Sequence, residues 1–288
     1  MRCHACAKIN WTLEILGRRA DGYHDLSMVM QTISLHDTLD LEPAPDTSLT
    51  VTGGGSDVPG DERNIALRAV RLMREVTGYP GGVRIHLEKR IPSQAGLGGG
   101  SADAAAVLLS LNRLWGAGLD QSGLEALGLR LGADVPFCLR GGLCRVEGIG
   151  ERLTPLPHAR EWPLIVLQPC PGLSTGAVFG AWRASSEGAA PETETLLRAF
   201  ASDDPRLLPR HPGNALEAVS RSMRPEIGAA VDDLLAAGAV CAQMSGSGSA
   251  VFGVFADGDA QASAMRRIRP RHPGACCCKT LVSACNPG

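Results

Sequence analysis

The feature that most constrains this chain is a glycine loop, residues 92–102, that leads directly into an alanine-rich segment. Four glycines fall within five positions, at Gly96, Gly98, Gly99 and Gly100. Without side chains in the way, the backbone N–H groups can converge on an anion, and the N-terminus of a following helix adds partial positive charge. The pattern predicts a polyphosphate site, followed by a helix over about 101–115.

Two familiar phosphate loops do not fit the glycine loop. A Walker A loop ends in Gly-Lys-Ser/Thr, and no lysine lies near Ser101. A dinucleotide fingerprint counted from Gly96 requires glycine or alanine at position 101, and it normally opens its domain. We therefore expect loop N–H groups, Ser101 and a bound Mg²⁺ to share the phosphate charge. The alternative, a glycine-rich hairpin, is disfavoured by the long helical pattern after Ser101.

Composition bounds the class of protein. The 288 residues are 44% hydrophobic, which favours two domains over one. The net charge is −2 and no basic patch stands out, so nucleic acid is not an expected partner. There is no signal peptide and no apolar run of about 18 residues, so we expect a cytoplasmic protein without membrane contact. Most of the ten cysteines lie in apolar runs, which argues against a zinc site or disulfide framework.

Hydrophobic periodicity indicates alternating strands and helices of an α+β protein. A linker containing Thr154, Pro155 and Pro157 suggests domains at 1–157 and 158–288. Strands are predicted near 6–16, 28–35, 38–42, 83–87, 137–147, 163–167, 239–244, 251–255 and 275–282. Besides the one after the glycine loop, helices are predicted near 64–76, 124–131, 176–184, 193–201, 214–221, 225–236 and 259–267.

Lys8 is a candidate because lysine is scarce: only Lys8, Lys89 and Lys279 stand among 28 basic residues, the rest being arginine. Its compact ammonium suits a single phosphate oxygen or carboxylate. In the predicted half-buried strand 6–16, Lys8 shares a polar face with Asn10 and Thr12, and that face could line a cleft. The alternative is a solvated strand edge.

Asp134 is the second candidate, because it lies among small and apolar residues in Leu131-Gly132-Ala133-Asp134-Val135-Pro136. An aspartate beside an acceptor hydroxyl can orient it or take its proton in phosphoryl transfer. Lys8 is a possible partner. A helix cap or a buried salt bridge are the structural alternatives.

Two further segments carry candidate binding groups. Tyr23 and His24 follow a predicted turn, and a Tyr-His pair can stack on a base and bond its edge; a plain surface loop is the alternative. The second glycine cluster, residues 245–249, reads Ser-Gly-Ser-Gly-Ser. It could clamp phosphate or form a tight turn before a buried strand.

Together these segments resemble the GHMP small-molecule kinases. The similarity rests on the glycine loop, the early lysine strand and Met244-Ser245-Gly246-Ser247-Gly248, and it spans nearly the whole chain. The segment from Ala7-Lys8-Ile9-Asn10 through Gly22-Tyr23-His24 is similar to the branch that phosphorylates the 2-hydroxyl of a cytidyl-linked methylerythritol, in the non-mevalonate route to isoprenoid precursors. Residues 144–150 and 214–217 fit the same branch.

The resemblance implies a two-domain α+β fold, with an N-terminal domain like ribosomal S5 domain 2 and a ferredoxin-like C-terminal domain. It implies ATP and Mg²⁺ as cofactors, a small-molecule substrate, and a monomer or weak homodimer. Lys8 and Asp134 match the family's catalytic pair, and Asn10, Tyr23 and His24 match its substrate-binding positions. Asn64 and Lys89 fall on the adenine side. The ATP loop corresponds to Pro92, Ser93, Gln94, Ala95, Gly96, Leu97, Gly98, Gly99, Gly100, Ser101 and Ala102.

Two positions depart from the family pattern: Gln94 stands where glycine is frequent, and Trp11 where aliphatic residues are usual. Neither removes a backbone donor, so the implied activity stands. Two other hypotheses remain open. One is a GHMP kinase for a mevalonate-type or homoserine substrate, which the Gly22-Tyr23-His24 turn disfavours. The other is a non-catalytic ligand sensor on the same scaffold, which the presence of both Lys8 and Asp134 disfavours.

Overall fold

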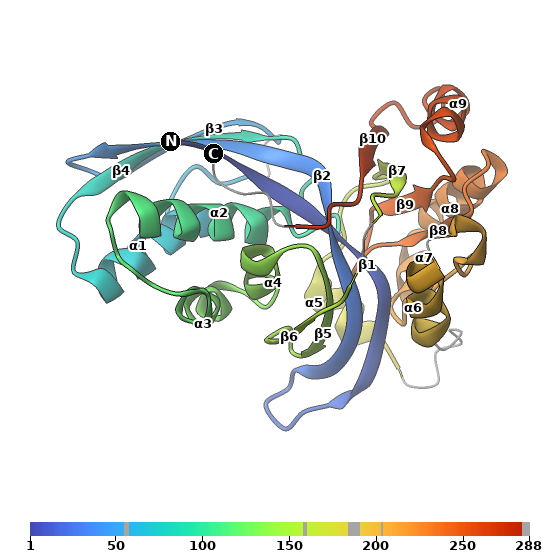
Figure 1. Ribbon diagram of the computed structural model, residues 1–288, viewed down its shortest axis with the longest axis horizontal. Coiled ribbons are helices and arrows are strands. Elements are labelled where there is room, and N and C mark those ends of the chain that lie inside the picture. The colour runs from blue at the N-terminus through green and yellow to red at the C-terminus, as the bar shows by residue number, and fades with distance from the viewer. Residues whose placement is uncertain (55–57, 158–159, 184–190, 203, 284–288) are drawn as a thin grey trace.

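The chain folds into two β-sheets with their helices, an α+β architecture as the sequence predicts (Figure 1). The structure is a computed structural model and describes residues 1–54, 58–157, 160–183, 191–202 and 204–283. Strands up to residue 155 form the first sheet, and strands from residue 163 onward form the second. We propose the division at 157/158 as the domain boundary.

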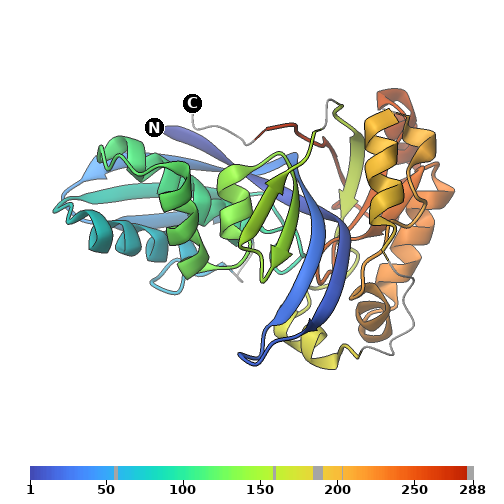
Figure 2. The same ribbon diagram turned by 60° about the horizontal axis from the view of Figure 1, so that its bottom comes forward.

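A long two-stranded ribbon is the central element of the first sheet. It consists of β1 (Arg2–Arg18) and β2 (His24–Ala44), which pair antiparallel along nearly their whole length. The sequence suggested two strands, near 28–35 and 38–42, but β2 is continuous. The polar residues between the two predicted strands, His36 and Asp37, pair in register with Cys6 and Ala5, and a register shift follows between Cys6 and Lys8. The ribbon therefore reaches from the first sheet to the second half of the molecule (Figure 2).

The other edge of β2 is shared by two strands. Its second part pairs with β4 (Gly82–Lys89) and its first part with β5 (Leu143–Gly148). The outer strands are β3 (Ser48–Gly53), parallel to β4, and β6 (Arg152–Pro155), antiparallel to β5. The strand β6 lies where the sequence suggested the start of the linker.

Four helices accompany this sheet: α1 (Ile65–Thr77), α2 (Gly99–Leu114), α3 (Gln121–Leu131) and α4 (Val135–Arg140). Small buried alanines let α2 pack closely against its neighbours, and Ala104 and Ala105 lie in the same core as Leu39 and Ile85. The prediction of a strand over 137–147 was wrong in its first part, which is α4. Consecutive glycines at 141 and 142, both with positive φ, separate α4 from β5.

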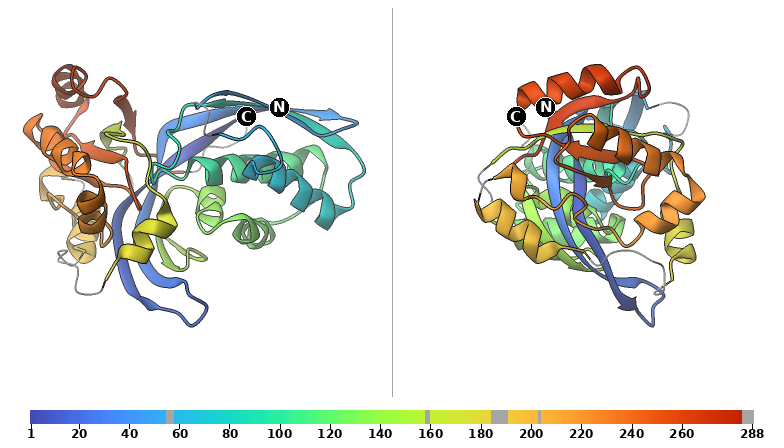
Figure 3. Two further views of the ribbon diagram at one scale, coloured as in Figure 1. Left: turned by 180° about the vertical axis from the view of Figure 1, so that it is seen from behind. Right: turned by 90° about the vertical axis from the view of Figure 1, so that its right-hand side faces the viewer.

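The second sheet has the antiparallel order β10-β7-β9-β8. Its strands are β7 (Pro163–Leu167), β8 (Cys241–Met244), β9 (Val251–Val254) and β10 (Cys276–Lys279). The helices of this half are α5 (Thr175–Ala181), α6 (Thr193–Ser202), α7 (Glu217–Met223), α8 (Glu226–Ala236) and α9 (Gly258–Ile268), with a 3₁₀ turn, η1 (Pro205–Leu207). Helices α8 and α9 complete the β-α-β-β-α-β order of a ferredoxin-like unit (Figure 3).

The two halves share a hydrophobic core along β1. Trp11 is fully buried and makes edge-to-face contacts with Phe200 and Phe252, at ring-centroid distances of 5.1 and 5.7 Å. The opposite face of β1 is buried too, since Lys8 and Asn10 are 4% and 1% exposed. The prediction of a half-buried strand was therefore wrong. Asn10 is bonded to Ser245 of the second half, whereas Lys8 lies against Asp134 of the first.

The described helices include none that is long and apolar enough to cross a membrane. Cys6 is disulfide-bonded, whereas the other described cysteines carry free thiols. Burial raises the pKa of Cys144 to about 11, and Cys138 and Cys241 are shifted further in the same direction. These side chains behave as small apolar groups.

Candidate active site

The glycine loop turns its carbonyl oxygens toward the protein body. Four of them accept hydrogen bonds from donors behind the loop. The pairs are Ser93 O with Gln168 Nε2 (3.3 Å), Ala95 O with Ala250 N (3.0 Å), Gly96 O with Ser245 Oγ (3.0 Å) and Leu97 O with Lys8 N (2.9 Å). Three of these four donors belong to the second half of the chain.

This arrangement leaves the loop's N–H groups free. A trans peptide points its C=O and the following N–H in opposite directions, so tying back the carbonyls turns the amides outward. In the part of the chain that the structure describes, no hydrogen bond takes up the N–H groups of Gln94, Gly96, Leu97 and Gly98. The same residues line a cavity of about 380 Å³. Free amides facing a cavity are what an anion requires.

Backbone conformation explains two of the glycines. Gly96 and Gly98 have φ values of 75° and 71°, which L side chains rarely adopt. A Cβ at Gly96 would also lie 2.1 Å from the carbonyl oxygen of Ser245. Gln94, where glycine is frequent in the family, also has a positive φ of 51°. The loop thus alternates the sign of φ, which produces concave nests of N–H groups.

The second glycine cluster supports the glycine loop from behind. Ser245 Oγ donates to Gly96 O and accepts from Asn10 N at 3.2 Å. Asn214 holds the cluster in turn, donating to the carbonyl oxygens of Met244 and Gly246 at 3.1 and 2.8 Å. Of the two possibilities left open by the sequence, the contacts favour a supporting turn.

Lys8 and Asp134 lie together, as predicted from the sequence. The Lys8 ammonium is 3.5 Å from Asp134 Oδ2 and donates to Asn10 Oδ1 at 2.7 Å. Lys8 is buried, whereas the Asp134 side chain is 35% exposed, enough to meet a ligand. Asp134 precedes α4 but makes no capping hydrogen bond, so its carboxylate remains available.

A larger cavity of about 910 Å³ lies beside the first, and the two share part of their walls. Gly96, Ser101, Asp134 and Thr175 line both. Lys8 and Asn10 border the larger cavity. A ligand in each cavity would therefore meet its neighbour beside Asp134, with the free amides of the glycine loop on one side of the junction.

Aromatic side chains gather around the larger cavity. His24 stacks on Phe179 of α5, with ring centroids 5.2 Å apart, and meets Trp182 edge-to-face at 5.8 Å. Tyr23 also lines this cavity and is 60% exposed, so its ring is free to cover a ligand. Sequence reasoning found Tyr23 and His24 but missed Phe179 and Trp182. The concentration of aromatics in Val178-Phe179-Gly180-Ala181-Trp182, in a chain with 4% aromatics, was the available signal.

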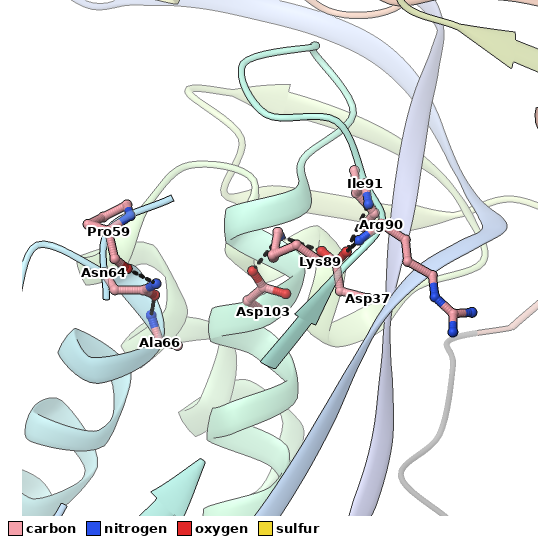
Figure 4. Close-up of polar contacts among 8 residues, drawn as sticks. All are labelled: Asp37, Pro59, Asn64, Ala66, Lys89, Arg90, Ile91 and Asp103. Atoms are coloured by element: carbon pink, nitrogen blue, oxygen red, sulfur yellow. Dashed lines mark hydrogen bonds and ion pairs between the residues drawn. The ribbon is translucent and has the colours of Figure 1, made fainter. Parts of the chain in front are cut away.

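Asn64 and Lys89 both line the smaller cavity, but their polar groups are already engaged (Figure 4). Asn64 caps α1: its Oδ1 accepts from Ala66 N at 2.9 Å, and its Nδ2 donates to Pro59 O at 2.7 Å. The Lys89 ammonium is buried between the carboxylates of Asp37 and Asp103. A contact of either residue with adenine stays a prediction.

Electrostatics around Lys89 are unusual. Burial alone would lower the pKa of Lys89, but Asp103 and Asp37 outweigh it and raise the pKa above its ordinary value. Burial raises the pKa of Asp103 to about 8, although Lys89 opposes the shift. Asp103 Oδ1 is buried and has no hydrogen-bond partner among the described residues.

Comparisons with known proteins agree with this geometry. The family model of the GHMP kinases N terminal domain matches residues 64–142, and that of the GHMP kinases C terminal domain matches residues 189–273. The 4-diphosphocytidyl-2-C-methyl-D-erythritol kinase of Symbiobacterium thermophilum is 44% identical, covering 98% of this chain and 99% of that protein. The enzyme of the same name from Gloeobacter violaceus is 43% identical, covering 95% and 91%.

Solved structures agree as well. A crystal structure of 4-(cytidine 5'-diphospho)-2C-methyl-D-erythritol kinase has a TM-score of 0.82 at 39% identity, covering 97% of this chain and 99% of that one. A homoserine kinase from Cytophaga hutchinsonii, 18% identical, has a TM-score of 0.74 and covers 98% and 95%, a likeness of fold alone. The chain is thus a small-molecule kinase and belongs to the 4-diphosphocytidyl-2-C-methyl-D-erythritol kinase family of the GHMP kinases.

Proposed function

We propose that this enzyme transfers the γ-phosphoryl group of ATP to the 2-hydroxyl of 4-diphosphocytidyl-2-C-methyl-D-erythritol, a step of the non-mevalonate route to isoprenoid precursors. The observation that carries the proposal is the junction of two cavities at Asp134. The smaller cavity, with its free amides, takes the nucleotide phosphates. The larger one takes the acceptor, and the reacting oxygen meets the γ-phosphate beside Asp134.

The rings around the larger cavity suit a cytosine. A pyrimidine offers a flat face to Tyr23 and polar edge atoms to His24. Phe179 and Trp182 hold the His24 ring from two sides, so that its free nitrogen is presented at a fixed position. Acceptors without a base, such as homoserine or mevalonate, would leave this aromatic end of the cavity unfilled.

Lys8 and Asp134 carry the chemistry in this proposal. Asn10 Oδ1 and the Asp134 carboxylate hold the Lys8 ammonium at a fixed position at the wall of the larger cavity. Asp134 accepts a hydrogen bond from the 2-hydroxyl, orients the oxygen for in-line attack and takes its proton as the new O–P bond forms. Lys8 also stabilises the negative charge that develops near the transferred group.

The nucleotide side needs a counterion for its phosphates. The described residues include no group of three or more His, Cys, Asp or Glu side chains able to hold a metal. Mg²⁺ commonly takes one or two protein ligands and receives the rest from substrate phosphates and water. The hydroxyl of Ser101, on the wall shared by both cavities, is a hard oxygen donor that fits this role. Mg²⁺ carried in by ATP would spread the charge on the β- and γ-phosphates.

The test is direct transfer of labelled γ-phosphate to the cytidyl methylerythritol, compared between wild type and Asp134→Asn. Homoserine and mevalonate serve as acceptors without a cytidine group. Asp120→Asn is a matched control, because Asp120 is an exposed helix cap that lines neither cavity. We expect transfer only to the cytidyl compound, lost in Asp134→Asn and kept in Asp120→Asn. Equal transfer to homoserine would favour another GHMP kinase, and no ATP consumption would favour a ligand sensor.

A further inference from the structure

A buried ion network lies where β4 passes into the glycine loop (Figure 4). Asp37, at the end of the β2–β4 ladder, is fully buried. Its Oδ1 accepts from the backbone N–H groups of Arg90 and Ile91, at 2.5 and 2.8 Å. These two residues come just before Pro92, so a side chain of β2 fixes the start of the loop.

The network also reaches the far end of the loop. Lys89 Nζ donates to Asp37 Oδ2 and, at 2.6 Å, to Asp103 Oδ2. Asp103 lies one turn inside α2, the helix that follows the loop. A Cβ added to Gly99 would be 3.4 Å from Lys89 Nζ, so the ammonium lies directly beneath the first residue of α2. Asp37, Lys89 and Asp103 therefore connect the start of the loop with its end.

Stability alone does not account for this network. Burying three ionisable side chains, at 4%, 0% and 4% exposure, carries a desolvation cost that an apolar cluster would avoid. Asp103 Oδ1 adds an unpaired buried atom. The network instead fixes positions. Through Asp37 and Asp103, the backbone amides before the loop and helix α2 after it are both held relative to the Lys89 ammonium.

We propose that Asp37, Lys89 and Asp103 form a clamp that sets the spacing between the two ends of the glycine loop, with Asp37 as the main positioning residue for the nucleotide. The inference rests on the proposed function, since it takes the loop to bind the phosphates of ATP. The free amides of Gln94, Gly96, Leu97 and Gly98 converge on one ligand only if both ends of the loop are held. Asp37 and Lys89 act on the nucleotide through the loop.

The test measures nucleotide binding apart from turnover. Asp37→Asn keeps the size of the side chain but places an amide N–H₂ against the Lys89 ammonium or against the two backbone donors. We expect its Kd for a non-hydrolysable ATP analogue, measured by calorimetry, to rise about 10- to 100-fold, because a loop that is no longer held must be ordered when the nucleotide binds. The Kd for the cytidyl acceptor should change by less than about threefold, because most of the residues that line its cavity lie outside the glycine loop.

Asp233→Asn is the matched control. Asp233 is an ion-paired, partly buried carboxylate of α8, bonded to Arg271 and His272, and it lines neither cavity. The Asp233→Asn protein should be less stable than the wild type, with an unchanged Kd for the nucleotide. In Asp37→Asn, hydrogen exchange should also be faster at the amides of Arg90 and Ile91, whose hydrogen bonds Asp37 accepts in the wild type, with wild-type exchange in β7–β9.

The outcomes are distinguishable. A folded Asp37→Asn with wild-type nucleotide affinity, or with equal losses for both ligands, would overturn the clamp. If Asp37→Asn does not fold, Asp103→Ala decides, because it removes the Lys89 acceptor on α2 and keeps a good helix-forming residue. A selective loss of nucleotide affinity supports the clamp, and an unchanged affinity refutes it. If the wild-type protein itself binds no nucleotide, the proposed function fails instead.

Discussion

Replacing Asp103 by asparagine should change how stability depends on pH. The pKa of Asp103 is about 8 in the folded protein, against an ordinary value of 3.8. Between these values the folded state keeps a proton that the unfolded state has lost. The free energy of unfolding falls with rising pH wherever the folded state binds more protons than the unfolded state. Asp103 therefore destabilises the wild type progressively as pH rises from about 4 to 8. Asparagine does not titrate and removes the effect.

The magnitude follows from the shift. Each pKa unit corresponds to about 1.4 kcal/mol, so between pH 5 and pH 8 the variant should gain up to about 4 kcal/mol relative to wild type. This value is an upper bound, because relaxation of the site and entry of water reduce the cost of a buried charge. Asparagine also retains an acceptor for Lys89, so we expect little loss of stability at pH 5.

Guanidinium unfolding midpoints at several pH values from 5 to 8 would measure the difference. Asp233→Asn is a control of opposite sign: the hydrogen bond from His272 lowers the pKa of Asp233, so its stabilisation is present above the ordinary pKa and is lost only as pH falls through the lowered one. Its curve should run parallel to wild type above pH 5. If the stability of Asp103→Asn and of the wild type changed with pH in parallel, the conclusion that Asp103 is protonated in the folded protein would be refuted.

Three further outcomes are expected. Asp134→Ala should lower kcat on the order of 100-fold or more with little change in the Kd for ATP, and equal losses in both would indicate a structural acid. His24→Ala should mainly raise KM for the cytidyl substrate in steady-state assays; an unchanged KM would remove His24 from the base pocket. Gly96→Ala should abolish nucleotide binding and cost about 1–3 kcal/mol of stability by thermal unfolding, since its φ is 75° and Ser245 blocks the added Cβ; wild-type affinity would contradict the role of the loop.

Local signals in the sequence were sufficient for much of the fold and for selecting the pair Lys8 and Asp134. The strand over 163–167 and the helix after the glycine loop appear where periodicity placed them, because apolar spacing reflects burial directly. Lys8 and Asp134, 126 positions apart in the chain, meet at 3.5 Å. Residue type, local composition and family resemblance selected them, and no pattern within the sequence sets their distance.

The remaining features depend on tertiary contacts. Asn10 and Thr12 resemble solvent-facing residues of a half-buried strand, but both are buried, and part of their contacts come from the distant Ser245 and Thr193. Asp37 lies in an ordinary polar stretch of β2, and its two backbone partners, Arg90 and Ile91, lie between β4 and the glycine loop. Phe179 belongs to the site because it stacks on the His24 ring, which comes from a distant segment. Such pairings join distant segments, so periodicity cannot predict them.

The origin of the donors behind the glycine loop has a genetic consequence. Although the loop lies wholly within the first 157 residues, Gln168, Ser245 and Ala250 orient three of its peptide groups. A gene truncated after codon 157 would therefore encode the glycine loop without the three contacts that orient its peptide groups. Recombination that exchanges halves between distant homologues must preserve these three contacts. Two of them require the side chains of Gln168 and Ser245, which bond to carbonyl oxygens of the loop. The conformation of the glycine loop, and with it the proposed nucleotide site, thus depends on both halves of the chain.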